Sequence, residues 1–222
     1  HGAGPRGLQV QERRGRPLRQ LSQAVPAVLD VARRNLPLLR LPPRVAVFYS
    51  RSRRTAARTG DDWSLRSATP PASLRLLLGL ARGRCEVVEI GTGTAWTTGA
   101  LALSDRRRRV LSLDPIVRPE REVYLGFLPA GARGRIELVD EPGEQDAAAR
   151  GWRPDFVFID GSHDREITAR TFEAWRPLLA PGGIVAFHDY GNVEYPGVTQ
   201  ALTDMGLEGD VMRDVFVWRD VR

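Results

Sequence analysis

Short apolar segments recur along residues 85–219, and stretches of mixed polarity long enough for a helix separate them. A short apolar run is typical of a strand buried on both faces, as in a parallel sheet. We predict such strands at Cys85–Ile90, Arg109–Leu113, Arg135–Val139, Phe156–Ile159 and Ile184–His188. We predict helices near Ala95–Ser104, Pro119–Leu128, Gly143–Arg150, Asp164–Leu179 and Pro196–Met205. The alternation predicts an α/β domain whose parallel sheet is covered on both faces.

The pattern changes at the C-terminal end of the chain. Gly209–Val211 and Val215–Arg219 flank Arg213-Asp214 as two strands flank a hairpin turn. We therefore expect an antiparallel pair of strands to close the sheet.

Residues 1–71 do not show this alternation. Residues 1–17 are rich in Gly, Arg and Pro, which predicts a poorly ordered tail. Between Leu18 and Leu36 apolar residues recur at every third or fourth position, which predicts an amphipathic helix. Such a helix has to bury its apolar face. It either covers a binding site or packs against a second subunit, and we expect a homodimer.

The remainder of this N-terminal part leads to the first helix of the domain. Val45–Tyr49 is a short apolar run, and Arg51–Asp62 is polar and is expected to form a loop. Thr69-Pro70-Pro71 precedes a predicted helix at Ala72–Ala81, because proline favours the first helical turn. We divide the chain into a tail at 1–17, an N-terminal helical extension at 18–71 and one domain at 72–222.

Composition and charge limit the classes of protein that fit. At 222 residues, of which 42% are hydrophobic, the chain is long enough for one α/β domain with an extension. No apolar run approaches the roughly 18 residues that span a bilayer, and nothing at the start is typical of a signal peptide. The single cysteine, Cys85, cannot form an internal disulfide. We expect a soluble cytoplasmic protein that does not bind membranes.

The net charge of +6 raises the question of a nucleic-acid partner. All 33 basic residues are arginines, and they are spread along the chain. The cluster Arg106–Arg109 has no interleaved aromatic residues, which favours a solvated turn over a phosphate track. We expect no nucleic-acid partner.

The first predicted strand runs into the glycine turn Gly91-Thr92-Gly93. Glycines lack a Cβ, so a ligand can lie against their backbone while the next helix opens toward it. The third glycine of the dinucleotide fingerprint would fall at Trp96, which disfavours a nicotinamide cofactor. Asp114 ends the second strand, where an acid can accept both hydroxyls of a ribose. The alternatives are a turn that needs glycine for its geometry alone and a carboxylate that only caps a turn.

Acidic residues also follow the fourth and fifth strands, within Asp160-Gly161-Ser162-His163 and His188-Asp189-Tyr190-Gly191. The two strands are neighbours in this topology, so Asp160 and Asp189 should lie side by side. Two adjacent carboxylates repel unless a cation lies between them, and a hard divalent ion with oxygen ligands meets that need. The alternative is that each acid caps a separate helix.

These segments, together with Leu179-Ala180-Pro181-Gly182-Gly183 and Pro196-Gly197, resemble class I S-adenosylmethionine-dependent methyltransferases. Within that class the chain is similar to the small bacterial macrocin and antibiotic-sugar O-methyltransferases, and more distantly to catechol and caffeoyl-CoA O-methyltransferases. The resemblance extends over about Asp61–Leu207. It implies a Rossmann-like, doubly wound, seven-stranded sheet that closes with the antiparallel pair. It also implies that S-adenosylmethionine is bound by Glu89, Gly91, Thr92, Gly93, Asp114, Asp140 and Asp160.

The resemblance further implies a divalent metal, Mg²⁺ or Mn²⁺, held by Asp160 and Asp189. His188 is a candidate further ligand, and the alternatives are that it contacts the substrate or caps the sheet. Such a metal orients a substrate hydroxyl and lowers its pKa. His163 falls where the catechol-type enzymes carry a lysine base, and an imidazole with a pKa near 6.5 is suited to that role. The expected catalytic residues are His163 and Asp160.

The resulting hypothesis is methyl transfer to the hydroxyl of a small molecule, a natural-product sugar or phenol. We assign the choice of acceptor to Arg51–Asp62, Trp63 and Gly191–Tyr195. One alternative is an RNA methyltransferase, which the charge favours, although the Asn/Asp-Pro-Pro-aromatic motif of base methylators is absent. Another is a cofactor-binding protein without catalysis, because Ser162 and Tyr190 replace residues typical of the metal site.

Overall fold

The computed structural model describes residues 37–220. The tail predicted at 1–17 and the amphipathic helix predicted between Leu18 and Leu36 lie outside these residues. Within the described part, no helix combines the length and the apolar content that a membrane-crossing helix needs.

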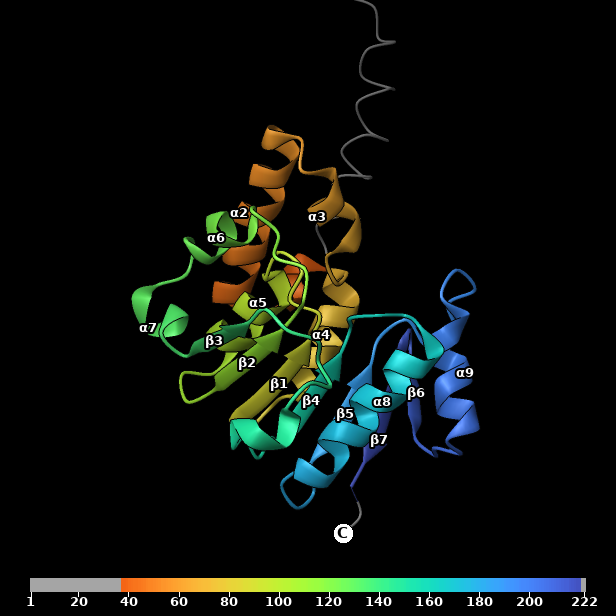
Figure 1. Ribbon diagram of the computed structural model, residues 1–222. Coiled ribbons are helices and arrows are strands. Elements are labelled where there is room, and N and C mark those ends of the chain that lie inside the picture. The colour runs from red at the N-terminus through yellow and green to blue at the C-terminus, as the bar shows by residue number, and fades with distance from the viewer. Residues whose placement is uncertain (1–36, 221–222) are drawn as a thin grey trace, which may run out of the picture. The chain divides into compact units, whose positions relative to one another are not determined.

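A seven-stranded sheet forms the centre of the fold, in the order β3-β2-β1-β4-β5-β7-β6 (Figure 1). The strands are β1 (Glu86–Ile90), β2 (Arg109–Leu113), β3 (Ile136–Val139), β4 (Phe156–Ile159), β5 (Ile184–Phe187), β6 (Asp210–Met212) and β7 (Val215–Arg219). Strands β1 to β5 pair in parallel, whereas β7 pairs antiparallel with both β5 and β6. The predicted fold class is confirmed.

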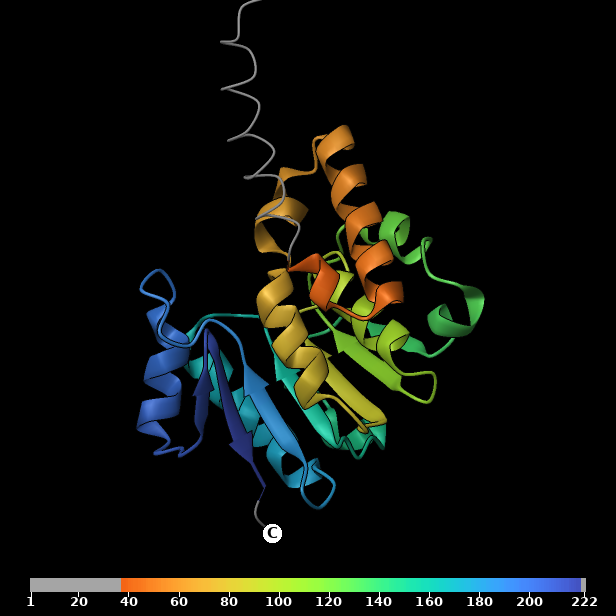
Figure 2. The ribbon, with the colours of Figure 1, turned by 180° about the vertical axis from the view of Figure 1, so that it is seen from behind.

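Side chains alternate along the central strands between two hydrophobic cores, because successive residues of a strand point to opposite faces. In β4, Phe156 and Phe158 belong to one core, and Val157 and Ile159 belong to the other. The first core includes α2 (Pro43–Thr59), α4 (Pro71–Leu80) and α5 (Trp96–Ser104), and the second includes α8 (Arg165–Trp175) and α9 (Pro196–Asp204). The two views show α4 and α8 on opposite faces of the sheet (Figures 1 and 2). Helices on both faces explain why β4 and β5 are apolar throughout.

The segment before the domain is more helical than its sequence predicts. Val45–Tyr49 and most of Arg51–Asp62 form the single helix α2, so the predicted loop is wrong. The buried positions Val45, Phe48, Ser52 and Ala56 follow helical spacing, and arginines fill the solvent side. Because arginine is a good helix former, a polar stretch of this kind continues a helix. Gly60, with φ 74°, ends it, and α3 (Asp62–Ser67) follows.

Two predicted helices are shorter than expected. Pro119–Leu128 contains only α6 (Arg121–Leu125), with α7 (Ala130–Arg133) after it. Gly143–Arg150 contains only the 3-10 helix η2 (Ala147–Arg150), because its first residues lie against the sheet. A Cβ on Gly143 would lie 2.3 Å from the Ile90 side chain. The other short helices are η1 (Leu38–Arg40) and η3 (Arg176–Leu178).

Candidate active site

The parallel strands end at one level, which places the residues that follow them side by side. Ile90 pairs with Leu113 and Ile159, and Ile159 pairs with Phe187. Each next residue continues the ladder, as in the 2.8 Å hydrogen bond from the Asp160 amide to the Ile90 carbonyl. A cavity of about 950 Å³ opens at this edge of the sheet. Sites for small molecules measure about 300–1,000 Å³, so this cavity can hold a cofactor and an acceptor together.

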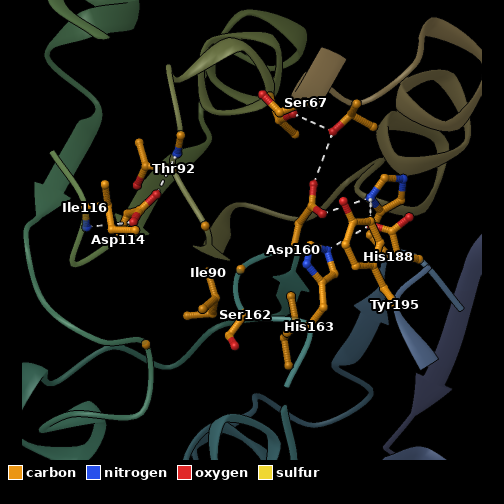
Figure 3. Close-up of a pocket in the computed structure, with 18 of the residues that line it drawn as sticks. Ser67, Ile90, Thr92, Asp114, Ile116, Asp160, Ser162, His163, His188 and Tyr195 are labelled. Atoms are coloured by element: carbon orange, nitrogen blue, oxygen red, sulfur yellow. Dashed lines mark hydrogen bonds and ion pairs between the residues drawn. The ribbon is translucent and has the colours of Figure 1, made fainter. Parts of the chain in front are cut away.

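The cavity has two halves joined by one residue. Figure 3 shows Thr92 and Asp114 on one side, His163, His188 and Tyr195 on the other, and Asp160 between them. We call the first side the cofactor half and the second side the acceptor half.

The glycine turn forms the floor of the cofactor half. Gly91 has φ 100°, and a Cβ on it would lie 2.2 Å from the Asp160 carbonyl oxygen. The Asp114 carboxylate accepts hydrogen bonds from the amides of Gly93 at 2.8 Å and Ile116 at 2.9 Å. A carboxylate oxygen accepts more than one hydrogen bond. Asp114 therefore orders the turn and can still accept from a ribose.

Two predicted cofactor residues, Glu89 and Asp140, are not among the residues that line the cavity. Glu89 is fully buried, accepts a hydrogen bond from Ser112 at 2.6 Å and another from Thr98, and has one oxygen without a partner. Burial raises the pKa of Glu89 to about 8, so this side chain is largely protonated at neutral pH. Asp140 forms an ion pair with Arg121 at 2.8 Å. Their contact with the cofactor stays a prediction.

The acceptor half brings together three groups that can bind a metal. Ligand atoms of Asp160, His163 and Asp189 all lie within 4.8 Å of one another. His163 Nε2 lies 2.9 Å from Asp189 Oδ2, and the Asn192 amide donates to the other Asp189 oxygen at 2.9 Å. This cluster differs from the predicted ligand set, because it contains His163 in place of His188.

His188 lies among three carboxylates instead. Its Nδ1 is 2.8 Å from Asp160 and 3.5 Å from Asp189, and its Nε2 is 3.3 Å from Asp214. Burial alone would lower the pKa of His188, but these carboxylates raise it to about 11. The imidazole therefore carries a positive charge at neutral pH, and both of its nitrogens face carboxylates.

The sequence analysis did not assign two polar residues of the acceptor half, Asp214 and Thr69, to the site. Asp214 lies in the β6–β7 turn, where it accepts from Ser73 at 2.7 Å and faces His188. Thr69, which lies before α4, donates to Asp160 at 3.4 Å. Their sequence neighbours contain only turn and helix-start signals, so nothing in the sequence placed them at the site.

Of the three segments assigned to acceptor choice, two line the cavity. Trp63 and the end of Gly191–Tyr195 do so, whereas Arg51–Asp62 does not. The Arg118 guanidinium lies over the Trp63 ring at 3.3 Å. The Tyr195 ring stacks on His163, with centroids 4.0 Å apart and an angle of 17° between the planes.

Comparison with known proteins agrees with this geometry. Residues 88–190 match a family model described as a methyltransferase domain. The chain carries a methyltransferase domain. The methyltransferase class predicted from the sequence is confirmed, and the matched residues include the glycine turn, Asp114, Asp160 and Asp189.

Solved structures share the fold at low identity. Rv0187 from MTB, solved with its cofactor, has a TM-score of 0.59 and 22% identity, with 82% of this chain and 90% of that chain covered. The O-methyltransferase TomG from Streptomyces achromogenes, which acts in tomaymycin synthesis, has a TM-score of 0.56 and 20% identity, with 75% and 87% covered. CalS11, the TDP-rhamnose 3'-O-methyltransferase of calicheamicin biosynthesis, has a TM-score of 0.54 and 19% identity, with 68% and 78% covered. These matches establish the methyltransferase fold of the chain.

Proposed function

We propose that the methyltransferase domain transfers a methyl group from S-adenosylmethionine to a hydroxyl of a small molecule, a natural-product sugar or phenol, with the help of a divalent metal. One observation carries the proposal. Asp160, His163 and Asp189 converge in the same cavity as the glycine turn. That arrangement places a candidate base and candidate metal ligands beside a candidate cofactor site.

In the cofactor half, Gly91, Thr92 and Gly93 would hold the methionine part and Asp114 would accept from the ribose. S-adenosylmethionine, when bound, supplies a methyl group already activated by its sulfonium. The protein then has to align the acceptor oxygen and remove its proton, and alignment alone can supply several kcal/mol.

In the acceptor half, His163 would take the proton of the acceptor hydroxyl. S-adenosylmethionine would supply the methyl group to the acceptor oxygen, and its sulfur would keep the electron pair of the bond to that methyl group. Burial would raise the pKa of Asp189, but the hydrogen bonds from His163 and Asn192 hold it below its ordinary value. Asp189 is therefore ionised and can stabilise the protonated His163.

A divalent metal fits the same residues. The carboxylates of Asp160 and Asp189 are oxygen ligands of the kind that Mg²⁺ and Mn²⁺ prefer. We propose that these two residues would hold the metal, which, when bound, lowers the pKa of the acceptor hydroxyl. His188 was expected as a further ligand. With both nitrogens facing carboxylates, it would instead hold Asp160 in place.

A transfer assay tests the proposal. The purified protein is incubated with methyl-labelled S-adenosylmethionine and hydroxylated sugars, nucleotide-linked sugars or phenols, each with and without a chelator, and with total RNA in a separate arm. We expect label in a small-molecule product and its loss with chelator. Label in RNA alone would favour the RNA methyltransferase that the +6 charge suggests. Transfer that resists the chelator would refute the metal.

The homodimer also stays a proposal, since it rests on the amphipathic pattern before residue 37. Sedimentation equilibrium of the full chain tests it, and a monomer at all concentrations would refute it.

A further inference from the structure

The loop after β5 is fixed against the segment that carries His163. Asp189 adopts φ 57°, and the Gly191 amide donates to Thr199 at 2.8 Å. At the start of α9, a Cβ on Gly197 would lie 2.2 Å from the His163 carbonyl oxygen. The backbones of these two segments are therefore in close contact, and Tyr195 lies between the two anchored points of the loop.

Tyr195 presents its ring face to the His163 imidazole. The centroids are 4.0 Å apart and the planes differ by 17° (Figure 3). The Tyr195 side chain is about 40% exposed, and its hydroxyl makes no hydrogen bond within residues 37–220. Its contact with the protein at this point is therefore made by the ring.

Two contacts restrain the imidazole in different ways. The Asp189 carboxylate, 2.9 Å from Nε2, holds one edge of the ring. A hydrogen bond at one edge still permits the ring to rock about that point, because the terminal torsion of histidine is broad. A parallel aromatic face removes this freedom, since rocking would drive one ring into the other. Asp189 and Tyr195 together fix both the edge and the plane of His163.

The two ring nitrogens of His163 have different surroundings. Nε2 lies against Asp189, whereas Nδ1 has no hydrogen-bond partner within residues 37–220. His163 also lines the cavity.

We propose that Tyr195 is a positioning residue that holds the plane of the His163 imidazole at the cavity, where His163 is the proposed base. The inference rests on the proposed function for its catalytic consequence, whereas the stack itself can be tested without any substrate. A residue that fixes geometry acts on turnover, because a misplacement of about 1 Å can cost about a hundredfold in rate.

Two substitutions separate the contribution of the Tyr195 ring from that of its hydroxyl. Tyr195→Phe keeps the aromatic face, and Tyr195→Leu removes it. We expect kcat of the leucine variant to fall about 10- to 100-fold, with the KM for S-adenosylmethionine unchanged, and the phenylalanine variant to stay close to wild type. If the leucine variant melts at a lower temperature than the assay permits, Tyr195→Met fills the space with a flexible side chain that has no ring.

An NMR measurement provides a second readout. The chain has three histidines, so the imidazole region contains three Cε1–H signals, and His163→Gln identifies the signal of His163. A ring face at 4.0 Å shifts this signal upfield through the ring current. We expect the shift in wild type and Tyr195→Phe and its loss in Tyr195→Leu. As the matched control, Tyr190→Leu removes a ring that packs on Phe216 instead, and should leave the His163 signal in place.

The outcomes distinguish the inference from the function it rests on. An unchanged His163 signal in Tyr195→Leu would show that the rings do not stack, and a lost shift with unchanged kcat would show that the stack does not position the base. Either result overturns the inference. If wild type transfers no methyl group to any acceptor, the proposed function fails, and the catalytic role of Tyr195 fails with it whatever the NMR spectrum shows.

Discussion

The two halves of the cavity are built in different ways. The cofactor half uses backbone amides and one carboxylate from two adjacent strand ends, at Gly91–Gly93 and Asp114. The acceptor half collects side chains from distant parts of the chain, including Thr69, Asp160 and Asp214. The proposed cofactor site is thus local in sequence, whereas the proposed acceptor site is assembled by the topology of the sheet.

The largest effect should come from His163→Gln, which removes the proposed base. We expect kcat to fall by about 10²- to 10⁴-fold near neutral pH and to recover partly at higher pH, where the acceptor hydroxyl ionises without help. The affinity for S-adenosylhomocysteine, measured by calorimetry, should stay unchanged because the substitution lies in the acceptor half. Equal loss of affinity would mean that the two halves are not separate. If kcat of His163→Gln does not change with pH, a group other than His163 takes the proton of the acceptor hydroxyl.

Gly91→Ala should disturb the cofactor half, because the turn packs against the backbone of Asp160, which joins the two halves. The residue would carry a Cβ at φ 100° and within 2.2 Å of the Asp160 carbonyl oxygen. Strain of up to about 3 kcal/mol weakens binding of S-adenosylhomocysteine by about a hundredfold. Gly182→Ala is the matched control, because its φ of 69° is also positive but no atom lies within 4 Å of its Cβ position. That variant should lose stability and keep its affinity; equal loss of affinity in both variants would contradict the role of the contact.

Asp114→Ala should weaken the cofactor half alone. The loss of a charge-assisted hydrogen bond costs roughly 1.5–3 kcal/mol, or about tenfold or more in the Kd of S-adenosylhomocysteine. Asp140 pairs with Arg121, and Asp140→Ala tests the predicted contact of this carboxylate with the cofactor. Unchanged affinity in Asp114→Ala would remove the ribose from this site.

The smallest effect should be one on stability. Burial raises the pKa of Glu89 from 4.5 to about 8, so the folded chain keeps a proton that the unfolded chain releases. The stability from this group is complete below pH 4.5 and is lost as the pH rises toward 8, by at most about 1.4 kcal/mol per pH unit. Glu89→Gln has no such proton, so the variant should gain stability relative to wild type between pH 6 and pH 7, as measured by urea unfolding. If the difference in the free energy of unfolding between the two proteins is the same at pH 6 and pH 7, Glu89 is ionised in the folded state.

The sequence allowed the sheet and the strand-end residues to be predicted because both follow from short-range patterns. Apolar runs predicted the five parallel strands, and the register of those strands placed Gly91, Asp114, Asp160 and Asp189 at one edge. The rest depends on long-range contacts. The helix α2 was predicted in part as a loop because its solvent side is rich in arginine. Asp214 reaches His188 only through the path of the β6–β7 hairpin.

The role of His188 shows a further limit. The position of His188 next to Asp189 suggested a further metal ligand, which stays a prediction, and the direction of each ring nitrogen depends on where other carboxylates lie. With Asp160 at 2.8 Å and Asp214 at 3.3 Å, both nitrogens face protein groups. No pattern of neighbouring residues could have shown this.

The absence of a side chain at Gly91 has a consequence for altering this protein. A Cβ built at this position would lie 2.2 Å from the Asp160 carbonyl oxygen, so the backbones that follow β1 and β4 pack directly against each other. Attempts to change acceptor preference by directed evolution should therefore succeed through substitutions at Trp63, Arg66 and Ser67 of α3 and at Asn192, Glu194 and Tyr195, which line the cavity from outside the sheet. Libraries that vary the strand ends should instead yield mostly inactive clones.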